Sequence, residues 1–187
     1  MVRIVVTGAA GRMGRNIINV IRETAETELA GAVERPGHPD IGKDVGEVSG
    51  SGKIDIKLTD NFEKAVKKAD CVIDFTLPEA TMHHLDIALK SKIAMVIGTT
   101  GFSHHQRERL KEVGSQMQIV AAPNMSVGVN LLLKVVSDMA KILGRDYDVE
   151  IVEAHHRLKK DAPSGTAMRF AEVLAHSLNR DLDKAAV

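Results

Sequence analysis

Near its N-terminus the chain reads Val2-Arg3-Ile4-Val5-Val6-Thr7-Gly8-Ala9-Ala10-Gly11-Arg12-Met13-Gly14. The run up to Thr7 is mostly apolar and predicts a buried strand, and the apolar periodicity from Met13 to Thr24 predicts a helix. Between them, glycines allow a tight turn whose backbone amides approach a pyrophosphate at the positive end of that helix. The GxxGxxG spacing is a variant of the dinucleotide-binding fingerprint, so this stretch predicts a nucleotide-binding α/β unit.

An acidic residue follows where such a unit requires one. Glu34 ends the second predicted strand, Leu29–Glu34, about twenty residues after Gly14, where a carboxylate meets ribose hydroxyls. A carboxylate favours the 2′-hydroxyl of NAD, whereas Arg35 beside it can take the 2′-phosphate of NADP, so the preference stays open. Arg12 is a candidate contact for pyrophosphate or 2′-phosphate. The alternative is a structural glycine turn followed by surface charges.

Strands and helices alternate through the first part of the chain. Further strands are predicted at Ile54–Leu58, Asp70–Phe75, Ile93–Ile97 and Gln118–Ala122. Helices are predicted from Asp60 as cap to about Lys68, from Pro78 to about Lys90, and from Ser103 as cap to about Gly114. The Gly-, Pro- and Ser-rich stretch 36–52 predicts a long loop. This alternation predicts an α/β fold, a Rossmann-like doubly wound parallel sheet with helices on both faces.

The pattern changes near residue 125. A long amphipathic helix is predicted over Val127–Leu143, ended by Gly144, followed by a strand over Tyr147–Ala154 and a helix from about Thr166 to Leu178. We therefore expect a dinucleotide-binding domain over 1–125. Residues 126–187 are expected to form an incomplete N-terminal part of an α+β substrate-binding and catalytic domain, because so few elements make a poor core by themselves.

Loops at the ends of the predicted strands are further candidates for cofactor contacts, since ligands bind outside the carboxyl ends of parallel strands. They are Phe75-Thr76, Gly98-Thr99-Thr100-Gly101 and Ala122-Pro123-Asn124-Met125-Ser126. The second loop offers close backbone approach and hydroxyls that suit a nicotinamide carboxamide. The alternative for any one of these loops is ordinary turn chemistry.

The segment Glu153–Ala167 carries the residues best suited to acid–base chemistry. His155, His156 and Lys159 can exchange protons, and Ser164 can cap a helix whose Gly165 and Thr166 amides would hold a carboxylate. The segment thus predicts a site for an anionic small molecule that is protonated, the alternative being a charged loop. Joint metal binding by adjacent histidines on an extended segment is disfavoured, because they point to opposite faces. Two other tandem pairs, His83-His84 and His104-His105, are interpreted as surface or packing residues.

Composition excludes several classes of protein. Lys plus Arg and Asp plus Glu number 25 each, and aromatic residues make up 3% with no Trp, so nucleic-acid binding is not expected. No stretch reaches the ~20 apolar residues of a membrane span, and no secretory leader is recognisable, which predicts a soluble cytoplasmic protein. The single cysteine, Cys71, rules out an internal disulfide and a multi-cysteine metal site, and is expected in the core. No metal is expected.

Together these motifs resemble the 4-hydroxy-tetrahydrodipicolinate reductase (dihydrodipicolinate reductase) family over essentially the whole chain. The resemblance rests on six stretches: Val6–Gly14, Glu34-Arg35, Asp74-Phe75-Thr76, Gly98–Gly101, Asn124–Asn130 and Glu153–Ala167. The last stretch is the most specific of the six.

The resemblance implies reduction of a cyclic dicarboxylate by NADH or NADPH, on the route to diaminopimelate and lysine. It implies His155 as proton donor and acceptor, Lys159 as proton donor, and His156, Gly165 and Thr166 as substrate ligands; which of His155 and Lys159 delivers the proton stays open. The implied and candidate cofactor contacts are Gly8, Ala9, Ala10, Gly11, Arg12, Met13, Glu34, Arg35, Phe75, Gly98, Thr99, Thr100, Ala122, Pro123, Asn124 and Met125.

Family members are longer and complete a mixed sheet through which they form homotetramers, so the resemblance also implies that this chain is truncated. Two alternatives to an active reductase remain. The first is a catalytically silent nucleotide-binding fragment, because a site without its supporting sheet is commonly too loose to work. The second is another NAD(P)-dependent dehydrogenase of amino-acid metabolism, against which the Glu153–Ala167 segment speaks.

Overall fold

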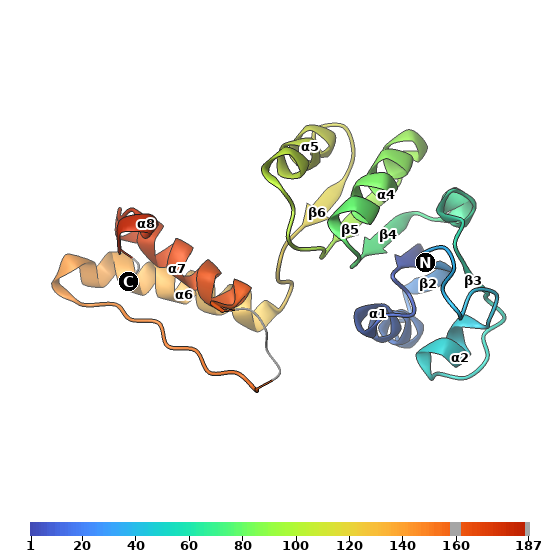
Figure 1. Ribbon diagram of the computed structural model, residues 1–187, viewed down its shortest axis with the longest axis horizontal. Helices are drawn as coiled ribbons and strands as arrows, with labels where there is room; N and C mark the ends of the chain where they lie inside the picture. The colour runs from blue at the N-terminus through green and yellow to red at the C-terminus, as the bar shows by residue number, and fades with distance from the viewer. Residues whose placement is uncertain (158–161, 186–187) are drawn as a thin grey trace. The chain divides into compact units, whose positions relative to one another are not determined.

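The computed structural model describes residues 1–157 and 162–185 and contains two compact units, Met1–Ala122 and Pro123–Val187 (Figure 1). The first unit is built around a sheet, and the described part of the second is helical with one long extended segment. Each unit is described by itself.

The sheet of the first unit has six strands in the order β3-β2-β1-β4-β5-β6, and every neighbouring pair is parallel. The strands are β1 (Val2–Thr7), β2 (Thr27–Val33), β3 (Leu58–Thr59), β4 (Cys71–Asp74), β5 (Ala94–Ile97) and β6 (Ile119–Ala121). The strand order reverses between β1 and β4, which is the switch point where ligands bind in open sheets. The predicted doubly wound parallel sheet is confirmed.

Helices cover both faces of this sheet. They are α1 (Arg12–Glu23), α2 (Val45–Ser49), α3 (Phe62–Ala65) with a 3₁₀ turn η1 (Val66–Lys68), α4 (Pro78–Ser91) and α5 (His104–Gly114). The alternation of β1 sends Val5 into one apolar cluster, with side chains of α3, α4 and α5, and Ile4 and Val6 into another, with side chains of α1 and α2. Each fully buried aliphatic side chain contributes about 1.5–3 kcal/mol relative to its exposed state, so the two clusters hold the sheet from both sides.

The region between β2 and β3 differs from the sequence prediction. The predicted loop 36–52 contains α2, because Asp44 Oδ1 accepts hydrogen bonds from the amides of Gly46 at 2.9 Å and Glu47 at 3.3 Å. The same oxygen accepts a hydrogen bond from the Ile54 amide at 3.0 Å. Because this amide is bonded to a side chain, it is not available for a strand pairing. The predicted strand over 54–58 is therefore reduced to β3.

The next helix is capped one residue later than predicted. Asn61 Oδ1 accepts a hydrogen bond from the Lys64 amide at 2.8 Å, so Asn61 and not Asp60 is the N-cap of α3. The predictions at Pro78 and Ser103 are confirmed, with Ser103 forming a full capping box with Gln106. Cys71 on β4 is half-buried and not fully in the core, and burial raises the pKa of its thiol.

The second unit is a helical pair followed by a short helix. Its helices are α6 (Val127–Leu143), a 3₁₀ turn η2 (Gly144–Asp146), α7 (Gly165–Ser177) and α8 (Leu182–Ala185). α6 and α7 lie side by side (Figure 1), with Ala140 and Ala175 buried and the Ser137 and Ser177 hydroxyls 2.9 Å apart. Gly144 ends α6 with a φ of 69°, which confirms the predicted glycine at the helix C-terminus.

The predicted strand over Tyr147–Ala154 is wrong. Residues 148–156 follow an extended path with no assigned secondary structure. A strand needs a hydrogen-bonded neighbour, and the described residues of the second unit include no other strand to provide one. A separate finding is that none of the helices within 1–157 and 162–185 is long and apolar enough to span a bilayer.

Candidate functional site

The glycine loop is shaped so that only glycine fits at its key positions. Gly8 has a φ of +61°, and a Cβ there would lie 3.1 Å from Thr76 Cγ2. A Cβ on Gly14 would overlap the Gly8 carbonyl oxygen and lie 2.6 Å from the Ala9 Cα. The N-cap of α1 is Gly11, which has no side chain to occupy the first amides of the helix. The loop therefore brings backbone close to the helix start, the arrangement that receives a pyrophosphate.

Glu34 lies directly against this loop. Its Oε2 accepts a hydrogen bond from the Ala10 amide at 3.1 Å, and its Oε1 accepts from the Arg35 amide at 3.0 Å. The Glu34 amide in turn donates to the Thr59 carbonyl at 2.9 Å, which fixes the chain as it leaves β2. The carboxylate is thus held beside the glycine turn, at the place where a ribose hydroxyl would donate to it.

A cavity of about 720 Å³ opens beside Glu34, within the range of small-molecule sites. Its wall includes Gly8 and Gly11 of the loop, Arg35, residues at the start of α3, and residues of α4. The predicted contacts Gly8, Gly11, Glu34, Arg35 and Phe75 line it together. Arg12 is exposed at the first residue of α1 and is not part of that wall. A glycine cradle, a placed carboxylate and a cavity of this size fit a dinucleotide.

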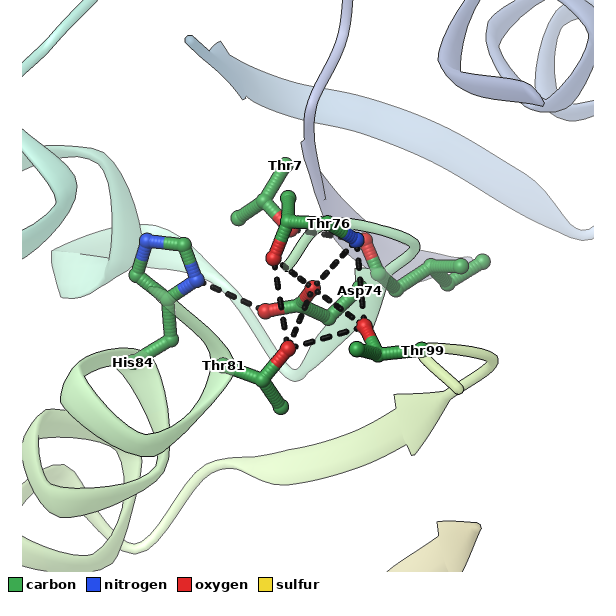
Figure 2. A network of polar contacts seen from close by, with 7 residues as sticks. Thr7, Asp74, Thr76, Thr81, His84 and Thr99 are labelled. Atoms are coloured by element: carbon green, nitrogen blue, oxygen red, sulfur yellow. Dashed lines mark hydrogen bonds and ion pairs between the residues drawn. The ribbon is translucent and has the colours of Figure 1, made fainter. Parts of the chain in front are cut away.

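The ends of β4 and β5 meet in a polar network that Figure 2 shows around Asp74. Asp74 is fully buried, and its Oδ1 accepts from the Thr76 amide at 3.0 Å and the Thr76 hydroxyl at 2.6 Å. The hydroxyls of Thr81, in the first turn of α4, and Thr99, just after β5, also donate to Oδ1, at 3.2 and 3.3 Å. On the other oxygen, His84 Nδ1 lies 2.7 Å from Oδ2.

This network ties two of the predicted cofactor loops to each other. Thr99 Oγ1 also accepts from the Thr76 amide at 3.1 Å and lies 2.8 Å from Thr81 Oγ1. Burial alone would raise the pKa of Asp74, but the hydrogen bond and charge of His84, with the hydroxyls, lower it below its ordinary value. Asp74 is therefore an ionised, buried anchor. Gly98 lies under the Phe75 ring, which a Cβ there would overlap, so the two loops are also in van der Waals contact.

Sequence reasoning missed the importance of this network. The sequence predicts His84 as a surface or packing residue. It is buried, pairs with Asp74 and packs against Phe62 in a tilted arrangement with the ring centroids 4.4 Å apart, whereas His83 is exposed. The signal available was Asp74 itself, an acidic residue ending an apolar strand. Because β4 is central, that position is necessarily buried and needs partners.

The third predicted loop joins the two units. Ala122 is the last residue of the first unit, and Pro123 to Met125 open the second. Asn124 Oδ1 accepts from the Ser126 amide at 2.9 Å, and Asn130 Nδ2 donates to the Asn124 carbonyl at 3.0 Å. Ser126 Oγ caps α6 by accepting from the Val129 amide at 3.4 Å. The loop is a well-formed helix cap in which the Asn124 side chain is engaged.

In the second unit Glu153 connects the extended segment to the start of α7. Its Oε1 accepts from the Ser164 amide at 2.9 Å, and its Oε2 lies 3.5 Å from His155 Nδ1. Ser164 Oγ accepts from the Ala167 amide at 3.1 Å, so Ser164 is the N-cap of α7 as predicted. Glu153 is a site residue that sequence reasoning did not single out.

The remaining predicted catalytic and substrate residues are divided between described and undescribed parts of the chain. Gly165 and Thr166 are exposed in the first turn of α7, and His156 is exposed on the extended segment. Lys159 lies outside the described residues. Over 1–157 and 162–185, no three acidic, histidine or cysteine side chains are grouped as a metal site would require.

Two family descriptions match the chain in succession: "Dihydrodipicolinate reductase, N-terminus" over residues 2–125 and "Dihydrodipicolinate reductase, C-terminus" over residues 128–186. The chain belongs to the dihydrodipicolinate reductase family. Curated relatives agree: the 4-hydroxy-tetrahydrodipicolinate reductases of Citrifermentans bemidjiense and Geotalea daltonii are 49% and 50% identical over 186 residues. Those alignments cover 100% of this chain and 70% of each relative.

A solved structure shows the same fold. The dipicolinate-bound dihydrodipicolinate reductase from Paenisporosarcina sp. TG-14 matches with a TM-score of 0.75 at 27% identity, over 95% of this chain and 67% of that one. As a dihydrodipicolinate reductase family member the chain is an oxidoreductase, and its nucleotide-binding unit serves NADH or NADPH.

Proposed function

We propose that this chain reduces 4-hydroxy-tetrahydrodipicolinate to tetrahydrodipicolinate with NADH or NADPH, in the biosynthesis of diaminopimelate and lysine. Loss of water from the substrate gives dihydrodipicolinate, to which a hydride and a proton are then added. The observation that carries the proposal is the match of both family descriptions along the chain, together with a glycine cradle and an anchored Glu34. We assign cofactor binding to residues 1–125 and the N-terminal part of the substrate domain to residues 126–187.

The first unit binds and orients the cofactor. The amides at the start of α1 and of the glycine loop receive the pyrophosphate, and Glu34 accepts a hydrogen bond from a ribose hydroxyl. Arg35 borders the cavity beside Glu34, where it can pair with a 2′-phosphate. The loop Gly98–Thr100 and residues Ala122–Met125 hold the nicotinamide end. When bound, the reduced nicotinamide supplies the hydride.

The second unit binds the dicarboxylate and supplies the proton. The amides of Gly165 and Thr166 in the first turn of α7 bind a substrate carboxylate at the positive end of that helix, with His156 as a further ligand. Because Nδ1 of His155 faces Glu153, Nε2 is the nitrogen that exchanges a proton with substrate. Lys159 is assigned as a proton donor from the family resemblance, and the order of transfer between it and His155 is left to experiment.

The test is oxidation of NADH and NADPH with freshly generated substrate, alongside a separate measurement of cofactor binding. We expect substrate-dependent oxidation that falls by about 10²–10⁴-fold in His155→Ala and Lys159→Ala, the usual contribution of an acid–base group. Both variants should bind NADH normally, because the substitutions lie outside the cofactor unit. Normal NADH binding without turnover by the unsubstituted chain would favour the alternative, a catalytically silent nucleotide-binding fragment.

The proposal also includes a cytoplasmic location and the homotetramer that the family resemblance implies. Self-association is supported by large apolar side chains that the second unit exposes along α6: Val127, Leu131, Leu132, Val135, Met139 and Ile142. Light scattering on the purified chain tests the tetramer, and a monomer would contradict that part of the proposal.

A further inference from the structure

Asp74 is a charged residue at a buried position, where an apolar side chain would cost less free energy to bury. It is 0% exposed at the carboxyl end of β4, which lies between β1 and β5 in the sheet. Burying a carboxylate costs several kcal/mol unless it is paired and fully hydrogen-bonded. Here both carboxylate oxygens have hydrogen-bond partners, which offsets the cost of burying the charge. The two oxygens have different partners.

Oδ1 acts on the loops at the ends of β4 and β5. It accepts from Thr76 and from the hydroxyls of Thr81 and Thr99, and Thr99 also accepts from the Thr76 amide. Thr76 also lies close to the glycine loop, because a Cβ on Gly8 would be only 3.1 Å from its Cγ2. A single oxygen therefore sets the relative position of Thr99 and of the backbone beside Gly8.

Oδ2 acts on the wall of the cavity. His84 Nδ1 lies 2.7 Å from it. His84 borders the cavity beside Glu34, and its ring packs against that of Phe62, which also borders the cavity. A histidine side chain has a rotatable ring, so a fixed partner on Nδ1 determines which ring edge and face the cavity presents. Without the carboxylate, the ring would lose the partner of its Nδ1 and keep only its packing against Phe62 among the contacts described above.

We infer that Asp74 is a positioning residue of the cofactor site, with Oδ1 fixing the loop that holds the nicotinamide end and Oδ2 fixing the wall around the adenosine end. This inference rests on the proposed function, because it takes the cavity and the Gly98–Thr100 loop as parts of one dinucleotide site. Asp74 is buried and does not touch the ligand, so its effect passes through Thr76, Thr99 and His84. Loss of its charge should weaken both ends. Loss of the Thr81 hydroxyl leaves the bonds from Thr76 to Oδ1 in place and removes a contact of Thr99, so it should weaken the nicotinamide end alone.

The experiment compares two ligands, NADH and ADP-ribose, by calorimetry on the whole 187-residue chain. ADP-ribose lacks the nicotinamide and reports the adenosine end. Thr81→Val is the key variant: Thr81 is fully buried, its hydroxyl contacts Asp74, Thr76 and Thr99, and valine keeps its shape. Asp74→Asn keeps the size of the carboxylate and removes its charge. Asp70→Asn is the matched control, because Asp70 precedes the same strand at its other end and pairs with Arg3.

We expect Thr81→Val to weaken NADH binding about three- to tenfold, which is the usual net contribution of one hydrogen bond, and to change ADP-ribose binding less than about twofold. Asp74→Asn should weaken both ligands, NADH by about tenfold or more, and Asp70→Asn should change neither. If Asp74→Asn does not fold in a thermal melt, the Thr81→Val ratio alone decides.

Equal loss of NADH and ADP-ribose affinity in Thr81→Val would overturn the division between the two oxygens. Unchanged NADH binding in both variants would overturn the inference while leaving the proposed function in place. Failure of the unsubstituted chain to bind either ligand would overturn the proposed function and this inference with it. The three results are distinct in the same set of titrations.

Discussion

Replacing Gly14 with alanine should loosen the glycine loop, although alanine is the better helix former. Gly14 lies in the first turn of α1, and its Cβ would lie 2.6 Å from the Ala9 Cα, where ordinary contact begins at 3.4 Å. Loop and helix would therefore have to separate by at least the difference, about 0.8 Å, and the overlap with the Gly8 carbonyl oxygen requires still more. The atoms that the new Cβ would meet, the Gly8 carbonyl oxygen and the Ala9 Cα, are backbone atoms, so the overlap cannot be relieved by rotation of a side chain. Overpacking of this kind costs about 1–3 kcal/mol, against about 1 kcal/mol gained from helix propensity.

We therefore expect Gly14→Ala to lower the free energy of unfolding by up to about 2 kcal/mol. For a chain of this size, each kcal/mol lost lowers the thermal midpoint by about 2–4 °C. The shift also moves the amides that receive the pyrophosphate, so NADH binding should weaken at least about tenfold, since displacements near 1 Å are costly in preorganised sites. Calorimetric melting and NADH titration measure the two effects.

Gly114→Ala is the matched control for this prediction. Gly114 ends α5 and a Cβ there would meet nothing within 4 Å, so alanine should stabilise the chain by up to about 1 kcal/mol and leave NADH binding unchanged. A Gly14→Ala chain that melts higher than the parent and binds NADH within about twofold of it would refute the reasoning, because the overlap would then be relieved at no cost.

Three further predictions concern single side chains. Glu34→Ala should weaken NADH more than NADPH in titrations, because the 2′-hydroxyl loses its acceptor; equal losses would contradict the ribose assignment. The side-chain hydrogen bond from Arg3 lowers the pKa of Asp70 to about 2, so the stability that this pair contributes is present above pH ~4 and is lost as the pH falls toward 2. Arg3→Ala should return the Asp70 pKa toward its ordinary value in a carboxyl NMR titration, and an unchanged value would be inconsistent with this cause. Ser164→Ala should destabilise α7 by about 1 kcal/mol through loss of its cap, seen as faster amide exchange in its first turn.

Features that depend on neighbouring residues were predictable from the sequence. The strand–glycine–helix order of residues 2–24, the Pro78 start of α4 and the Ser103 and Ser164 caps all follow local rules of backbone conformation and amide capping. The position of Glu34 beside the glycine loop was predictable for a related reason, because about twenty residues separate the glycine turn from the end of the next parallel strand. The parallel sheet followed from the alternation of these units.

Features that depend on distant partners were not predictable in the same way. The Tyr147–Ala154 segment has the apolar content of a strand, but strand formation depends on a neighbour and not on composition alone. Asp44 could not be recognised as a cap with a second role, because the Ile54 amide that it accepts from lies ten residues further on.

The Asp74 network shows what a reading of single motifs leaves out. His84 belonged to one of three tandem histidine pairs, and by itself it carried no more information than His104 or His105. What distinguishes it is a carboxylate ten residues earlier that must be buried because its strand is central, and that needs a donor for each oxygen. A helix that follows such a strand after a short loop brings its first two turns to the strand end. The pattern therefore has a physical cause: an acidic residue ends a central strand, and hydroxyl and histidine residues follow in the first two turns of the next helix. Such a pattern predicts a buried, hydrogen-bonded carboxylate, whereas a histidine pair by itself predicts no such contact.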